Sequence, residues 1–305
     1  MGRFAMNLMM MAGLVAVQVL RAEPASKPES PTYARPQMLV EPKQLDTGKA
    51  KANYHLLDIR DAKAFTEAHI PGAVLAPKGI WSAAVTEGKA DEAFWRMQLS
   101  QLGITPTKPV VIIGDDIKEA ARTWWLLRYA GVPDVRLLHG GWQAYQKLGA
   151  TTESGPVTPT PEPAYSWQLH PQLRAEKAEI LDLLSAQTRN VQILDARSLE
   201  EFRGVRKLSN RGGHIPQAIR LEWSEFLEPQ TQRFLPAEKL RDLLQSRKID
   251  LTQPCLTYCQ SGGRAAVVAF ALELMGVKQV KNYYRSWSEW GNDPDTPIVN
   301  DEKNP

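Results

Sequence analysis

The chain has 305 residues, 43% of them hydrophobic, which is the composition of a globular protein long enough for two domains. Its 37 basic and 34 acidic residues leave a formal net charge of +3, too small to argue for nucleic-acid binding. No cluster of His, Cys and Asp has metal-ligand spacing, and no phosphate-binding glycine motif is present. We therefore expect no metal, no cofactor and no nucleic-acid partner.

Residues 1–22 have the pattern of an export signal. Arg3 supplies the positive charge, residues 4–20 are mostly apolar, and Leu20-Arg21-Ala22 is a passable cleavage site. The segment is short for a membrane span, and an uncleaved anchor is the alternative because Arg21 lies beside the site. We expect a periplasmic or secreted protein with no stable membrane span after cleavage. Residues 23–36, rich in Pro, Ser and Lys, are expected to form a flexible lead-in.

Two α/β units follow. Apolar runs at 54–59, 110–113 and 135–138 predict strands in a first domain, residues 37–150, with helical patterns between them. Residues 151–166 are Pro-rich, as is typical of a linker. Strands are expected again at 191–194, 255–258 and 279–282, in a second domain, residues 167–305.

The two units are sequence repeats of each other. Leu57–Arg60 and His69–Ala73 recur as Leu194–Arg197 and His214–Ala218. Further along, Gly131 matches Gly276 and Trp142 matches Trp287, with a constant offset of 145 residues. We predict an α/β fold of two tandem domains, each a small, mainly parallel sheet flanked by helices.

The second unit contains a cysteine where a strand passes into a helix. The predicted strand at 255–258 is followed directly by Cys259, a small-residue loop comes next, and an apolar helical run begins at Ala265. Helix N-terminal N–H groups have no helical partners, and together with the helix dipole they favour the thiolate. Gly262 and Gly263 can take φ > 0 and turn successive amides inward as an anion cradle. The alternative is a buried cysteine beside an ordinary turn.

Arg264 falls in the first turn of that helix. A cation is unfavourable there unless an anion lies beside it, and we interpret that anion as the thiolate or a charged substrate. The spacing Cys-x4-Arg is one residue shorter than the Cys-x5-Arg of cysteine-dependent phosphatases, which leaves a phosphatase as a remote alternative.

The corresponding loop of the first unit has different chemistry. The offset places Gly114 opposite Cys259 and Glu119 opposite Arg264, and Asp115 and Asp116 lie between them. We expect this loop to repel anions and the first domain to be inactive.

The other cysteine, Cys255, begins the strand that ends before Cys259. In an extended strand their Cα atoms would lie about 13 Å apart, too far for a disulfide. We expect Cys255 to pack in the core and Cys259 to be free.

The Cys259 loop resembles that of the rhodanese sulfurtransferases. Phe65–Ala73 is similar to the family's first-domain motif and Ser286–Trp290 to its C-terminal motif. Tandem rhodanese-like domains, an inactive first and an active second, are typical of thiosulfate and 3-mercaptopyruvate sulfurtransferases. The resemblance implies that Cys259 attacks the outer sulfur of a small-molecule donor, becomes a persulfide, and passes the sulfur to cyanide or a thiol.

The resemblance also implies substrate-binding residues. The cradle would be formed by Gln260, Ser261, Gly262 and Gly263, with Arg264 beside it. Arg197 matches a donor-binding arginine of the family, with a salt bridge to Asp195 or Glu200 as the alternative. Arg211 is matched with a second such arginine of the mercaptopyruvate enzymes, and a solvated surface charge is an equal alternative. His69 and His214 occur in both halves, so we expect them to order the fold.

The sequence departs from the family where Arg264 replaces a hydroxyl residue. An arginine favours an oxyanion such as a thiosulfonate by charge and bidentate geometry. We therefore predict a thiosulfate sulfurtransferase. The alternatives are a 3-mercaptopyruvate sulfurtransferase and a non-enzymatic sulfur-carrier or binding module with a protein sulfur acceptor as partner. Gln217, in place of the usual Gly, and Tyr284-Arg285, where the family often has Asp-Gly, leave the second domain's turns open.

Overall fold

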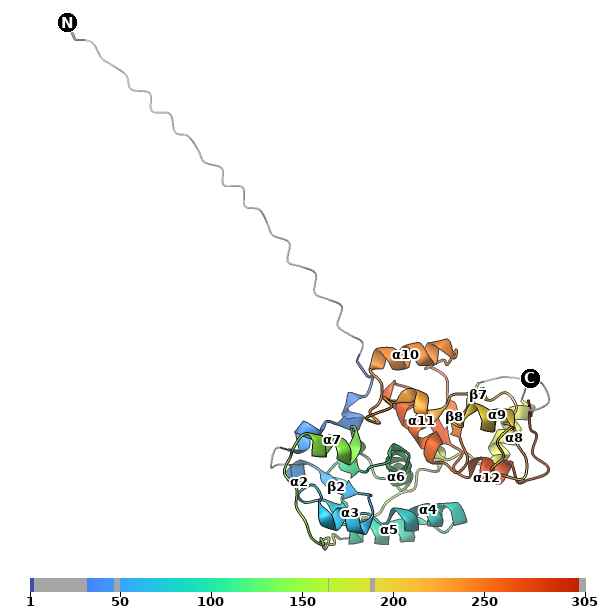
Figure 1. Ribbon diagram of the computed structural model, residues 1–305, viewed down its shortest axis with the longest axis horizontal. Helices are drawn as coiled ribbons and strands as arrows, with labels where there is room; N and C mark the ends of the chain where they lie inside the picture. The colour runs from blue at the N-terminus through green and yellow to red at the C-terminus, as the bar shows by residue number, and fades with distance from the viewer. Residues whose placement is uncertain (3–31, 47–49, 164, 187–189, 302–305) are drawn as a thin grey trace. The chain divides into compact units, whose positions relative to one another are not determined.

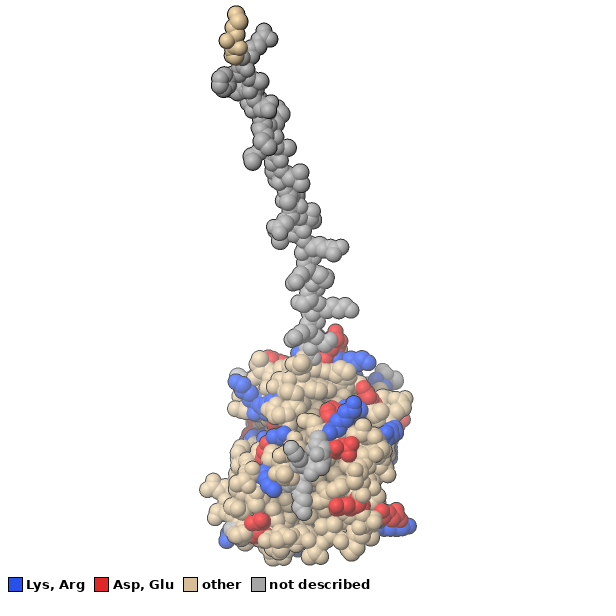
Figure 2. Space-filling view, turned by 90° about the vertical axis from the view of Figure 1, so that its left-hand side faces the viewer, with Lys and Arg blue, Asp and Glu red and all other residues tan. Residues whose placement is uncertain are grey.

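A computed structural model describes residues 1–2, 32–46, 50–163, 165–186 and 190–301. All but the first two residues of the predicted export signal, and most of the predicted lead-in, lie outside these ranges. Within the described ranges, no helix is long and apolar enough to cross a membrane. Basic and acidic side chains are interspersed on the face shown in Figure 2.

The first half is built on a parallel five-stranded sheet with the order β1-β5-β4-β2-β3. Its strands are β1 (Leu39–Val40), β2 (His55–Asp58), β3 (Val74–Leu75), β4 (Val110–Ile113) and β5 (Val135–Leu138). Every residue of β4 is buried, as expected for a central parallel strand covered on both faces. The helices are η1 (Pro36–Met38), α1 (Pro42–Leu45), α2 (Ala50–Asn53), α3 (Ala62–Glu67), α4 (Lys78–Glu87), α5 (Glu92–Gln101), α6 (Ile117–Tyr129) and α7 (Gly141–Lys147).

The second half repeats this plan with a parallel sheet of order β7-β6-β8-β9. Its strands are β6 (Gln192–Asp195), β7 (Ile219–Arg220), β8 (Cys255–Tyr258) and β9 (Val280–Asn282). The helices are η2 (Pro171–Leu173), α8 (Lys177–Ser185), α9 (Leu199–Arg203), η3 (Trp223–Phe226), α10 (Ala237–Ser246), α11 (Gly263–Leu274) and α12 (Ser286–Trp290). The two sheets confirm the predicted fold class.

All six predicted strands are present, each within one residue of its expected ends. The sequence did not predict β1, β3 and β7, which have only two residues each and so carry no periodicity.

The two halves share a hydrophobic core along α6 and α11, which lie side by side in Figure 1. Trp124 of α6 meets Phe270 of α11 edge to face, with ring centroids 4.9 Å apart. At the end of this contact Glu273 pairs with Arg128 at 2.5 Å and with Arg35 at 3.1 Å. The helix that follows β4 therefore packs directly against the helix that follows β8.

Two connecting segments are anchored. The Tyr33 hydroxyl donates to the carbonyl of Leu235 at 2.8 Å and the Arg35 N–H donates to Leu274 O at 3.1 Å, so the end of the predicted lead-in contacts the second half. In the predicted linker, Glu153 forms paired backbone hydrogen bonds with His69, and the Glu162 N–H donates to Ser100 O at 3.1 Å. The Pro-rich segment thus runs along the first half.

Candidate active site

Cys259 lies directly after β8 and only 1% of it is exposed. The backbone N–H of Gly262 donates to its Sγ at 3.1 Å. Gly262 is the N-cap of α11 and has φ of 86°, a conformation that a residue with a side chain rarely adopts. Gly263 does not have a positive φ, so of the two loop glycines only Gly262 takes the predicted conformation. The sulfur is thus held at the N-terminus of a buried helix.

The carbonyl groups of the loop are all held by other groups. Because a trans peptide points its C=O and N–H in opposite directions, a fixed carbonyl also fixes the N–H of the next residue. The four bonds are Trp287 N–H to Cys259 O at 3.0 Å, Ser288 N–H to Gln260 O at 2.9 Å, Arg122 Nη1 to Ser261 O at 2.8 Å, and Asn282 Nδ2 to Gly262 O at 3.1 Å. The loop is therefore fixed as a cradle and is not a mobile turn.

The side chain of Ser286 binds the backbone of Cys259. Its Oγ accepts the Cys259 N–H at 3.1 Å and donates to Tyr283 O at 2.6 Å. Its φ is 53°, which costs a residue with a side chain roughly 1 kcal/mol or more. The equivalent position in the first half is Gly141, with φ of 61°. The strain at Ser286 is thus located beside the nucleophile.

Both cysteines are free and buried. Cys255 lies in β8, where burial raises the pKa of its thiol to about 12. Both cysteines belong to the same hydrophobic core cluster. What distinguishes Cys259 is its position after β8 and the Gly262 N–H donated to its sulfur, whereas Cys255 fits the predicted packing role.

Comparison with known proteins assigns the fold to a family. The rhodanese-like domain matches residues 41–148 and 177–293. The chain belongs to the rhodanese-like domain family. It is 30% identical over 288 residues to the sulfur carrier protein TtuD of Thermus thermophilus, covering 89% of this chain and 99% of that protein. It is 29% identical over 274 residues to a thiosulfate sulfurtransferase of Azotobacter vinelandii, covering 87% and 98%.

A third relative is the 3-mercaptopyruvate sulfurtransferase of Escherichia coli, 28% identical over 244 residues, covering 78% of this chain and 85% of that protein. Among solved structures, YnjE is 26% identical with a TM-score of 0.78, covering 88% of this chain and 69% of that chain. These relatives confirm the resemblance to tandem-domain thiosulfate and 3-mercaptopyruvate sulfurtransferases. They carry different names, so they support a sulfurtransferase family without fixing the donor.

In this rhodanese-like loop Arg264 is paired with Glu201 of α9. The two side chains meet through bonds of 2.6 and 2.8 Å, and 20% of the arginine side chain remains exposed. Burial works to lower the pKa of Arg264, but the hydrogen-bonded Glu201 carboxylate and the electrostatic interaction with Cys259 outweigh it, so the pKa is raised. We expected the anion beside Arg264 to be the thiolate or a substrate; the anion in contact with it is Glu201.

Arg197 has the salt bridge that was its alternative interpretation. It binds Asp195 at 2.6 Å, donates to Gly213 O at 2.7 Å, and is 1% exposed. In the first half, Arg60 binds Asp58 at 2.7 Å and Ala68 O at 2.6 Å. Because the half without a nucleophile has the same arrangement, these contacts support a structural role for Arg197.

Arg211 is directed at the segment that follows α12. Its guanidinium donates to Trp290 O, Pro294 O and Thr296 O at 3.0 to 3.2 Å. These contacts attach the C-terminal segment, so Arg211 is not a solvated surface charge, and its donor-binding role stays a prediction. Gln260, by contrast, lies at the cradle, and its Nε2 donates to Ser209 Oγ at 3.1 Å.

The repeated histidines have the same contacts in both rhodanese-like halves. His69 Nδ1 bonds Phe65 O at 2.8 Å, and its ring stacks on Phe65 at 4.1 Å. His214 Nδ1 bonds Phe202 O at 2.8 Å, and its ring stacks on Phe202 at 3.6 Å. Both histidines therefore order the segment that precedes a strand, as their presence in both halves suggested.

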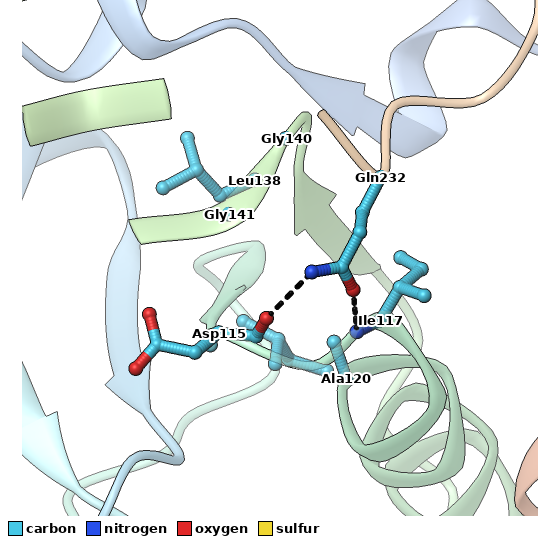
Figure 3. A pocket seen from close by; sticks show the side chains of 9 residues that line it. Asp115, Ile117, Ala120, Leu138, Gly140, Gly141 and Gln232 are labelled. Carbon is cyan, nitrogen blue, oxygen red and sulfur yellow. Dashed lines mark hydrogen bonds between the residues drawn. The ribbon is translucent and has the colours of Figure 1, made fainter. Parts of the chain in front are cut away.

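The loop of the first half is closed by a residue from the second half (Figure 3). Gln232 Oε1 accepts the Ile117 N–H at 3.1 Å, and its Nε2 donates to Asp115 O at 3.0 Å. The acidic side chains of this loop are partly neutralised, since Asp116 pairs with Lys118 at 3.2 Å and Glu119 with Arg122 at 3.4 Å. The described residues include no group of three or more His, Cys, Asp and Glu side chains that could hold a metal ion.

Sequence reasoning missed Arg122 of α6, which reaches the cradle from the first half. The repeat could not reveal it, because the 145-residue offset places Val267 at the equivalent position. Burial works to lower the pKa of Arg122, but the hydrogen bond with Tyr284 and electrostatic interactions with Tyr284, Glu119 and Cys259 outweigh it, so the pKa is raised.

Proposed function

We propose that this protein transfers the outer sulfur of thiosulfate to a thiophilic acceptor through a persulfide on Cys259. The observation that supports this most directly is the Gly262 N–H donated to Sγ inside a loop whose four carbonyls are held by other groups. A backbone N–H aimed at the sulfur from the N-terminus of α11 stabilises negative charge there, on the thiolate and on the persulfide anion.

The reaction has two steps. The Cys259 thiolate attacks the outer sulfur of thiosulfate, a sulfur–sulfur bond forms on the cysteine, and the sulfur–sulfur bond of thiosulfate breaks. Sulfite leaves with the electron pair. Cyanide or a thiolate then attacks the outer persulfide sulfur, takes it as thiocyanate or a new persulfide, and returns the Cys259 thiolate.

The donor is inferred from Arg264. Glu201 binds both terminal nitrogens of Arg264, and 20% of the arginine side chain stays exposed, so a donor anion would be bound by the remaining N–H groups of the guanidinium. A fixed, planar cation suits the sulfonate end of thiosulfate better than a hydroxyl side chain would at this position.

The donor can be tested by comparing kcat/KM for thiosulfate and 3-mercaptopyruvate. We expect the unsubstituted protein to prefer thiosulfate, and Arg264→Thr to lower that preference by about 10-fold or more. Arg241→Thr, at an exposed position of α10, is the matched control and should leave the preference unchanged. An unsubstituted protein that prefers 3-mercaptopyruvate would establish the alternative donor.

A sulfur carrier is the second candidate function, because the relative named sulfur carrier protein TtuD matches 89% of this chain. A carrier should discharge its persulfide mainly to a partner protein and only slowly to small thiols. Rapid multiple turnover with cyanide or a small thiol would therefore favour the enzyme.

We also propose that the protein is exported to the periplasm or secreted, on the pattern of residues 1–22. N-terminal sequencing of the protein from a periplasmic fraction tests this. A mature chain that starts after Ala22 is expected, and a cytoplasmic chain that retains Met1 would contradict it.

A further inference from the structure

We propose that Arg122 is a positioning residue for the sulfur chemistry of Cys259, supplied by the half that has no nucleophile. This inference rests on the proposed function of the Cys259 loop. It assigns the first half a direct part in that site, in addition to its packing against the second half.

The first argument concerns one peptide group. The peptide between Ser261 and Gly262 accepts a hydrogen bond from Arg122 Nη1 at its carbonyl, at 2.8 Å, and donates its N–H to Cys259 Sγ at 3.1 Å. The two bonds are on opposite ends of the same peptide dipole. A cation on the oxygen therefore both orients this N–H and strengthens it as a donor to the sulfur. The other three loop carbonyls are held from within the second half.

The second argument concerns Gly263. A Cβ added at Gly263 would lie 2.7 Å from Nη2 of Arg122 and 3.1 Å from Cζ of the same arginine. Because Gly263 does not have a positive φ, its backbone does not require glycine. The glycine is required by the space that the guanidinium occupies against the first residue of α11.

The third argument is that Arg122 is itself fixed. Its Nη1 lies 3.3 Å from the Tyr284 hydroxyl and 3.4 Å from Ser82 Oγ, and its Nε lies 3.4 Å from Glu119 Oε1. Tyr284 and Ser82 share a hydrogen bond of 2.7 Å, and Tyr284 stacks on Trp125 at 4.9 Å. Side chains of α4 and α6 in the first half thus hold the arginine and the second-half segment that it contacts.

The test compares the pH dependence of Cys259 alkylation by iodoacetamide in variants of the full chain carrying Cys255→Ser. We expect Arg122→Gln to move the midpoint of the rate profile upward by on the order of one pH unit, because a cation that stabilises the thiolate is lost. Arg122→Lys keeps the charge without the planar fork, so its midpoint should lie between the two.

Arg128→Gln is the matched control. Arg128 also lies on α6 and also reaches the second half, through Glu273, but it does not touch the cradle. Its alkylation profile should overlay that of the unsubstituted chain. If Arg122 had only a structural role, Arg122→Gln would lower the urea unfolding midpoint as Arg128→Gln does, and neither variant would shift its alkylation profile.

Gly263→Ala gives an independent second variant. Its Cβ would displace only the flexible end of Arg122, so the fold should survive. We expect the same upward shift, and no further shift when it is combined with Arg122→Gln, since both changes remove one interaction.

An Arg122→Gln profile identical to that of Arg128→Gln would overturn the inference, as would fully additive shifts in the double variant. The proposed function is tested separately, by sulfur uptake of the unsubstituted chain from thiosulfate. If the chain takes up no sulfur from thiosulfate, the proposed function fails, and the alkylation comparison still decides whether Arg122 affects Cys259.

Discussion

Replacing Gly262 by Ala tests the packing behind the cradle. The position has φ of 86°, and an added Cβ would lie 2.7 Å from the Tyr284 ring and 2.8 Å from the Tyr284 carbonyl oxygen. The left-handed conformation alone costs about 1–2 kcal/mol for an alanine. Relieving the contact requires the backbone at Tyr284 to move, which adds roughly 1–3 kcal/mol. We expect Gly262→Ala to lower the free energy of unfolding by the sum of the two terms.

Gly149→Ala is the control, because Gly149 has φ of 68° and an added Cβ there would meet nothing within 4 Å. It should show only the conformational cost. Urea unfolding of both variants gives the comparison, and the rate of cyanide-dependent turnover gives a second readout. A displaced cradle should lower the rate of Gly262→Ala about 100-fold, with no change in Gly149→Ala. Equal destabilisation of the two variants would refute the close packing of Tyr284 on the loop.

Three further predictions follow from single contacts. Cys259→Ser should abolish turnover, whereas Cys255→Ser should retain it, because burial raises the pKa of the Cys255 thiol to about 12; steady-state cyanolysis measures both. Burial, aided by Lys108, lowers the pKa of His55 from 6.5 to about 4, so its contribution to stability is complete above pH 6.5 and is lost as the pH falls toward 4. His55→Asn should therefore flatten the pH dependence of the urea unfolding midpoint between pH 6.5 and 4. An unchanged slope would contradict this. Gln232→Ala removes the hydrogen bonds to Ile117 and Asp115, so it should lower the free energy of unfolding by about 1–3 kcal/mol, which urea unfolding measures. It should leave the Cys259 alkylation profile unchanged.

The fold could be predicted because its signals are local and occur twice. The apolar runs of β2, β4 and β5 recur as those of β6, β8 and β9, so each prediction in one half supports its counterpart in the other. The strand, loop and helix around Cys259 were predicted for the same reason, since a small-residue loop between two apolar runs leaves few other structures.

The partners of the arginines could be predicted only when they are close in sequence. Arg197 pairs with Asp195, two residues away, and the sequence offered that pair as an alternative. Arg264 pairs with Glu201, and Arg122 bonds Ser261 in the other half. Such contacts depend on how β8 and α11 are placed against α9 and α6, which residue spacing does not encode.

The departures from the family pattern have structural explanations. Tyr284 replaces a residue that is often Asp, and it joins the halves through Ser82 and Trp125. Gln217 replaces a glycine and keeps the positive φ of the matching Gly72, 66° against 80°. The turn is therefore conserved between the halves at the cost of local strain in the second.

The intact mass of the protein after incubation with thiosulfate tests the central claim most directly. We predict a gain of one sulfur atom per chain, located on the peptide that contains Cys259 and removed by cyanide, with no gain in Cys259→Ser. A chain whose mass does not change, or a sulfur that is retained in Cys259→Ser, would contradict the account.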